Sequence, residues 1–127
     1  MTASARWANE HVALRVGSDI ALANAMAHVV IAEGLQHGWF VENSTRGYDD
    51  LRQSVAETTP EWAQHETGVA ADQIRRIARR YATVDRANIC WTLGITEHHN
   101  AVDNVHALIN LALLTGHFGR LGSGLNP

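Results

Sequence analysis

Two loops in this 127-residue chain combine a glycine with hydroxyl and carboxylate groups that could bind a nucleotide-like ligand. The first loop is Gly17-Ser18-Asp19, and the second is Gly94-Ile95-Thr96-Glu97. Each loop precedes a predicted helix, and the amide groups at a helix amino terminus attract phosphate. A carboxylate can also accept hydrogen bonds from a guanine edge, a pterin amine or a sugar hydroxyl. The alternative for Gly-Ser-Asp is a plain helix cap, which is the more common role of such a sequence.

The segments that precede both loops are predicted to be strands, at residues 11–16 and 88–93. A long and mainly helical crossover joins them, which favours a parallel arrangement. In an open parallel sheet, ligands bind beyond the carboxyl ends of the strands. We therefore expect the two loops to lie on the same rim of the sheet and to form half of a ligand site.

Helices are predicted from the residues that start and stop them. Thr59 and Pro60 start one helix, and Gly34, Gly68 and Gly116 stop others. The predicted helices cover residues 20–33, 49–57, 60–66, 71–82 and 101–115, with a short turn or helix at 39–43. Ser18 or Asp19 is the expected cap of the first and Asn100 that of the last. The first helix is apolar nearly all round, which predicts burial on more than one side. The fold class is therefore α/β, a partial doubly wound, Rossmann-like parallel sheet that is mostly helical, with two parallel strands and about five helices.

Composition narrows the possible partners. The formal net charge is −3, with mixed signs along the chain, so neither nucleic acid nor an anionic membrane is an expected partner. No apolar stretch reaches the roughly 18 residues of a membrane span, and no signal peptide is visible at the amino terminus, so we expect a cytoplasmic location. Cys90 is the single cysteine, which excludes an internal disulfide and an iron–sulfur cluster held by about four cysteines. Inside the predicted strand, Cys90 is expected to be a buried, inert thiol.

Other titratable residues do not form a recognisable catalytic or metal site. His98 and His99 are adjacent in a loop and lack a carboxylate or cysteine at fixed spacing, so we expect them to border the second loop or a domain contact. The paired arginines at 75–76 and 79–80 form a basic helix face. This face is either solvated, in contact with further domains, or an electrostatic patch for a partner. No catalytic residue and no metal ligand is assigned within the chain.

Three stretches carry a resemblance to a known family. They are His11–His28, the run Ile89-Cys-Trp-Thr-Leu-Gly-Ile-Thr-Glu-His-His-Asn100 with the helix that follows it, and the tail Thr115-Gly-His-Phe-Gly-Arg-Leu-Gly-Ser-Gly-Leu-Asn-Pro127. Their order and spacing resemble the cofactor-binding domain of molybdopterin-dependent oxidoreductases, and most closely the catalytic (alpha) subunit of formate dehydrogenases.

The resemblance assigns roles to both loops. It implies that Gly17, Ser18 and Asp19 touch the guanosine part of a molybdopterin guanine dinucleotide. It also implies that the segment 92–97 lies against the cofactor, which adds Leu93, Gly94, Thr96 and Glu97 to the cofactor-binding residues. The family usually has Gly-Met-Gly-Ile/Val-Thr-Gln here, and this chain departs from it with Thr92, Leu93 and Glu97. The last change matters most, because replacing an amide by a carboxylate removes two donors and adds a charge.

The resemblance further implies that the chain is part of a larger enzyme that oxidises formate to carbon dioxide. Such an enzyme carries molybdenum or tungsten in a bis-molybdopterin guanine dinucleotide, together with a [4Fe-4S] cluster that this chain does not bind. We expect residues 1–127 to be a fragment of one cofactor-binding domain, truncated at both ends, whose glycine-rich tail lacks a closing element. Its partners would be the remaining domains of the catalytic subunit, and alone it would be inactive. The alternatives are a fragment of a sister enzyme such as a nitrate reductase, or a non-catalytic nucleotide-binding or interaction module.

Overall fold

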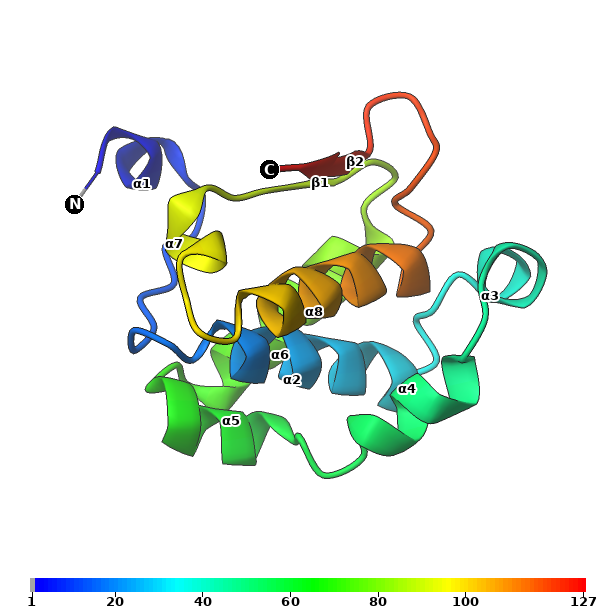
Figure 1. The fold of residues 1–127 in the computed structure, drawn as a ribbon, viewed down its shortest axis with the longest axis horizontal. Helices are drawn as coiled ribbons and strands as arrows, with labels where there is room; N and C mark the ends of the chain where they lie inside the picture. The colour runs from blue at the N-terminus through cyan, green and yellow to red at the C-terminus, as the bar shows by residue number, and fades with distance from the viewer. Residues whose placement is uncertain (1) are drawn as a thin grey trace.

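The structure, a computed structural model, describes residues 2–127 and is mostly helical with one small sheet (Figure 1). In chain order the elements are α1 (Ala3–Trp7), α2 (Asp19–Ala32), α3 (Gly38–Ser44), α4 (Tyr48–Ser54), α5 (Pro60–Thr67), α6 (Ala71–Thr83), β1 (Asn88–Cys90), α7 (Leu93–Thr96), α8 (Ala101–Leu114) and β2 (Gly124–Asn126). The predicted fold class, a mainly helical α/β arrangement with two parallel strands, is confirmed. Across residues 2–127, no helix is long and apolar enough to cross a membrane.

Helix α2 is the central element of the fold. It packs against α8 on one side and against α5 and α6 on the other (Figure 1). Ala25 and Val30 of α2 are fully buried, and each belongs to a different hydrophobic cluster. The prediction that this helix is buried on more than one side is therefore confirmed. Its small alanine side chains allow the neighbouring helices to approach closely, while the apolar surface that they remove from water stabilises the fold.

The sheet has two parallel strands, but its second strand is not the predicted one. β1 pairs with β2, in the register Asn88↔Gly124, Ile89↔Leu125 and Cys90↔Asn126. The expectation that no closing element follows the glycine-rich tail is therefore wrong, because that tail returns to pair with β1. The tail contains no local signal for a strand, because glycine disfavours strands in general. The expected burial of Cys90 is also wrong, since the thiol-bearing residue is exposed on this narrow sheet.

Residues 11–16 are extended but do not form a strand. Val12 and Leu14 point inward and pack against the cluster around Ile74, while the alternate residues 11, 13 and 15 are exposed. This alternation has the period of a half-buried strand, which explains the prediction. The segment instead lies against the end of α5, where the Arg15 amide donates to the Thr67 carbonyl at 2.9 Å.

The glycine stops are confirmed, and two of them share one geometry. After α2, the Gly34 amide donates to the Ile31 carbonyl at 3.2 Å and the Leu35 amide to the Val30 carbonyl at 2.8 Å. This is a Schellman motif, with Gly34 at φ +66°. The end of α8 repeats it around Gly116 at φ +69°. Glycine adopts this left-handed conformation without the steric cost that other residues meet.

The predicted amino-terminal caps were right only in part. The Thr59 hydroxyl accepts from the Trp62 amide at 3.2 Å and starts α5, with Pro60 as its first residue. Ser18 and Asn100 occupy the cap positions of α2 and α8, but neither side chain caps its helix. The Ser18 hydroxyl instead donates backward to the Arg15 carbonyl at 2.6 Å.

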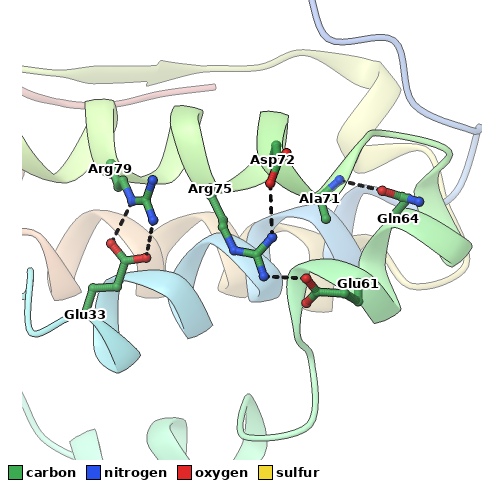
Figure 2. A network of polar contacts seen from close by, with 7 residues as sticks. All are labelled: Glu33, Glu61, Gln64, Ala71, Asp72, Arg75 and Arg79. Carbon is green, nitrogen blue, oxygen red and sulfur yellow. Dashed lines mark hydrogen bonds and ion pairs between the residues drawn. The ribbon is translucent and has the colours of Figure 1, made fainter.

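The basic face of α6 is largely paired within the chain. Figure 2 shows Arg75 directed at Glu61 of α5 and Arg79 directed at Glu33 at the end of α2. Arg79 donates from Nε and Nη2 to the two carboxylate oxygens of Glu33 at 2.8 and 2.9 Å. A third arginine, at position 76, pairs with Glu10. Three of the four arginines thus hold α6 to neighbouring segments, which disfavours an open patch for a charged partner.

We expect the Glu33→Gln substitution to flatten the loss of stability in acid. The hydrogen bonds from Arg79 lower the pKa of the Glu33 carboxyl below its ordinary value. A lowered folded-state pKa contributes stability above the unfolded-state pKa, and this contribution disappears as the pH falls through the folded-state value. Since the side chains of Arg79 and Glu33 are 54% and 33% exposed, solvent screens the pair and the effect on stability at pH 7 is small. Urea midpoints at pH 7 and pH 3 measure it, with the exposed Glu42→Gln as control. If Glu33→Gln lowered the urea midpoint by the same amount at both pH values, the expectation would be contradicted.

Candidate functional site

The first candidate loop is a tight turn that leads into α2. Gly17 has φ +83°, and the Ser18 amide and hydroxyl both donate to the Arg15 carbonyl, at 3.2 and 2.6 Å. Asp19 is the first residue of α2 and is half-buried. Since the Ser18 proton is already donated to the backbone, its hydroxyl oxygen can only accept a further hydrogen bond.

The second candidate loop begins where β1 ends. The Trp91 amide donates to the Asn126 carbonyl at 3.0 Å, which extends the pairing of the two strands by one residue. The predicted strand to Leu93 is too long, because the chain turns at Thr92 and Leu93 starts α7. Leu93 is 62% exposed, and an added Cβ on Gly94 would meet nothing within 4 Å. These two residues therefore present an open surface rather than a buried strand end.

A buried side chain that the sequence interpretation missed fixes this loop. Asn104 of α8 is 3% exposed, and its Nδ2 donates to the Ile95 carbonyl at 3.0 Å. A single polar residue in the first turn of a helix gives no periodic signal. Its role is visible only when the structure places α7 over α8.

Both loops border one groove. This groove has a volume of about 120 Å³. It is lined by Asp19 from the first loop and Ile95 from the second, together with side chains of α2 and α8. Figure 1 places α7 and the amino end of α2 at the same end of the molecule, on the left of the view. The loops thus meet across the helices α2 and α8, and not across paired strands 11–16 and 88–93 as expected.

A second, larger groove lies at the carboxyl ends of β1 and β2. It has a volume of about 330 Å³, and its lining residues are Trp91, Thr92, Leu93, Thr96 and Pro127. Sequence interpretation did not single out Trp91 and Pro127 as site residues. Of the predicted site residues in the described part of the chain, Gly17, Ser18, Gly94 and Glu97 do not line either of these two grooves.

The carboxylates at or beside the two grooves suit a ligand that carries amine and hydroxyl donors. Asp19 offers a carboxylate on the smaller groove, and Glu97 offers an exposed one directly after α7. Trp91 Nε1 is buried, and no partner for its hydrogen lies within residues 2–127. An unpaired buried donor is unfavourable, so a ligand acceptor beside Trp91 would relieve that cost.

Two histidines lie beside the second loop. Across residues 2–127, no three His, Cys, Asp or Glu side chains are grouped so that they could hold a metal ion. His98 is half-buried and His99 exposed, next to the second loop.

The sequence as a whole matches a family of redox enzymes. Residues 2–127 match the molybdopterin oxidoreductase family, so the chain belongs to that family. It is 44% identical over 98% of its length to formate dehydrogenase H of Escherichia coli (strain K12), of which it covers 17%. It is 40% identical over 99% of its length to the F420-dependent formate dehydrogenase 2 subunit alpha of Methanococcus maripaludis, of which it covers 19%. The chain therefore spans less than a fifth of these relatives.

A solved structure shares the fold. Acetylene hydratase from Pelobacter acetylenicus matches 95% of this chain with a TM-score of 0.91 and 31% sequence identity, and the match covers 17% of that protein. The arrangement of helices and strands described above is therefore also that of a segment of this hydratase. Membership of the family implies a molybdenum or tungsten pterin cofactor in the enzyme.

Proposed function

We propose that this chain is part of the cofactor-binding domain of a formate dehydrogenase catalytic subunit, which oxidises formate to carbon dioxide. The observation that carries the site assignment is the groove that Asp19 shares with Ile95, because it joins two loops far apart in the sequence. The similarity to formate dehydrogenases of a bacterium and an archaeon, along nearly the whole chain, supports the substrate. The remaining domains of the subunit would be its partners.

The proposed ligand is the guanine dinucleotide form of the cofactor, a molybdenum or tungsten bis-molybdopterin guanine dinucleotide. When bound, this group supplies the redox-active metal that takes up the two electrons of formate. Gly17, Ser18 and Asp19 would contact its guanosine part, with the Asp19 carboxylate accepting from an amine. Leu93, Gly94, Thr96 and Glu97 would lie against the pterin side. Glu97 can accept from a pterin N–H but cannot donate, unlike the glutamine usual in the family. The [4Fe-4S] cluster would be held by other parts of the subunit.

We expect Asp19→Ala in the intact subunit to lower its cofactor content several-fold, because a carboxylate that pairs with an amine of the ligand is lost. Asp103→Ala is the matched control, since Asp103 also lies in the first turn of a 14-residue helix but is exposed and outside both candidate loops. Metal analysis and the guanine nucleotide released by acid give the content. Equal contents in the two variants would contradict the assignment.

A second candidate is a sister enzyme with another substrate. The observation in its favour is the 31% identity with a hydratase, because the same fold there serves a protein named for a different reaction. Assaying the intact enzyme with formate, nitrate and acetylene in parallel separates the two candidates. Turnover of formate alone supports the first.

A further inference from the structure

Arg15 joins the first candidate loop to a helix on the other side of it. Its backbone amide donates to the Thr67 carbonyl at 2.9 Å, and its Nη1 donates to the His65 and Glu66 carbonyls at 2.5 and 3.3 Å. These carbonyls belong to the last turn of α5, where helical partners are lacking. A positive charge is also favourable at this end of a helix. Arg15 therefore caps α5 from a separate segment of the chain.

The same residue closes the turn that contains the candidate site. The Arg15 carbonyl accepts both hydrogen bonds from Ser18, and the Ser18 carbonyl in turn accepts from the Leu22 amide of α2 at 3.1 Å. The backbone amide, the backbone carbonyl and Nη1 of Arg15 thus all form hydrogen bonds, and these bonds make two connections. One connection leads to α5, and the other leads through Ser18 to the start of α2.

The surroundings leave room for this arrangement. Gly68, at φ +78°, lies under the guanidinium, and a Cβ added there would lie 3.7 Å from Arg15 Nε. At the other end of the segment, Glu10 accepts from Gln73 Nε2 at 3.0 Å and pairs with Arg76. The segment 10–16 is therefore held at both ends, and Arg15 is the anchor next to the loop.

We propose that Arg15 is a positioning residue, which fixes the Gly17–Asp19 loop against α5 so that Asp19 faces Ile95 across the shared groove. Arg15 contacts neither groove, so it acts through Ser18 and the start of α2. Its link to cofactor binding rests on the function proposed above. Its link to the loop rests only on the hydrogen bonds just described.

The test measures hydrogen exchange and cofactor content in the intact subunit. Arg15→Met keeps the apolar stem and removes the donors, while Arg15→Lys keeps the charge and can reach one carbonyl. We expect roughly tenfold faster exchange of the hydrogen-bonded Ser18 and Leu22 amides in Arg15→Met, a smaller increase in Arg15→Lys, and unchanged exchange in the middle of α8. Metal content should fall in the same order. Arg52→Met is the control, because Arg52 is exposed and pairs with Asp49, which lies three residues earlier in the chain.

The outcomes separate this proposal from the proposed function. Unchanged exchange at Ser18 and Leu22, or an equal increase throughout α8, would overturn the positioning role whatever the metal content. Faster exchange confined to the loop and the start of α2 supports the role. If metal content then stays constant in both Arg15→Met and Asp19→Ala, the role holds and the contact between loop and cofactor is wrong.

Discussion

With formate as the substrate, the purified 127-residue chain is expected to reduce a dye acceptor orders of magnitude more slowly than the intact enzyme does, so that no reduction is measured. Oxidation of formate releases carbon dioxide, one proton and two electrons, and the electrons need a redox group and a path away from it. The chain has one cysteine, whereas an iron–sulfur cluster takes about four. When several groups act together in catalysis, removing some of them lowers the rate by orders of magnitude and not in proportion to the number removed.

The assay compares the chain with the intact subunit at equal molar concentration. A tag-only preparation controls for contaminating enzyme, and Glu97→Ala controls for activity that depends on the chain itself. Dye reduction that exceeds the tag-only background and disappears in Glu97→Ala would show that the chain is catalytic alone. That result would overturn the interpretation of the chain as one part of a larger active site.

Gly116→Ala is expected to be among the most destabilising single substitutions in the chain. Gly116 has φ +69°, and an added Cβ would lie 2.9 Å from both Cγ and Cδ2 of His37. The left-handed backbone costs roughly 1–2 kcal/mol for alanine, and the overlap with the imidazole adds about 1–3 kcal/mol. The next residue is also constrained, because His117 is buried and its Nε2 bonds to the Tyr81 carbonyl at 2.9 Å.

Gly34→Ala provides a matched control for the steric part of this effect. Gly34 ends a helix of the same length with the same Schellman geometry, at φ +66°, and an added Cβ there meets nothing within 4 Å. Urea unfolding should show a clearly lower midpoint for Gly116→Ala than for Gly34→Ala. When both glycine variants are made in a His37→Ala background, the difference between their urea midpoints should be smaller. Equal midpoints for the two single glycine variants would show that the imidazole moves aside without cost.

Local sequence signals were sufficient for most of the helices. The stops at Gly34, Gly68 and Gly116 and the start at Thr59-Pro60 act through the backbone of a few neighbouring residues, so they can be recognised without knowing the fold. The burial of α2 could also be predicted, because a helix without a polar face must be covered on several sides.

Strand pairing could not be predicted in the same way. The alternation around Val12 and Leu14 shows which side chains are buried, but it does not show whether the backbone partner is a strand or a helix end. Here the partner is the Thr67 carbonyl of α5. Conversely, Leu125 pairs with Ile89 across 35 intervening residues, and the glycine-rich sequence around it gives little local indication of a strand.

The two loops of the candidate site could be predicted, but the contacts that hold these loops to other segments could not. The glycines and carboxylates of the loops are visible in the sequence, but Arg15, Trp91 and Asn104 act through contacts with distant segments. Asn104 binds a carbonyl of α7, and Arg15 binds carbonyls of α5. Such residues have no characteristic neighbours in sequence, so only the structure identifies them.

The central position of α2 has a consequence for synthesis on the ribosome. The helix that it contacts most, α8, begins about 80 residues later in the chain. At roughly 5–20 residues per second, α2 waits ~4–16 s for that partner. During this interval α5 and α6 can cover one side, while the side that α8 will occupy stays open to water. A nascent chain arrested before residue 101 should therefore bind chaperones that recognise apolar helices, and release from them should follow the emergence of α8.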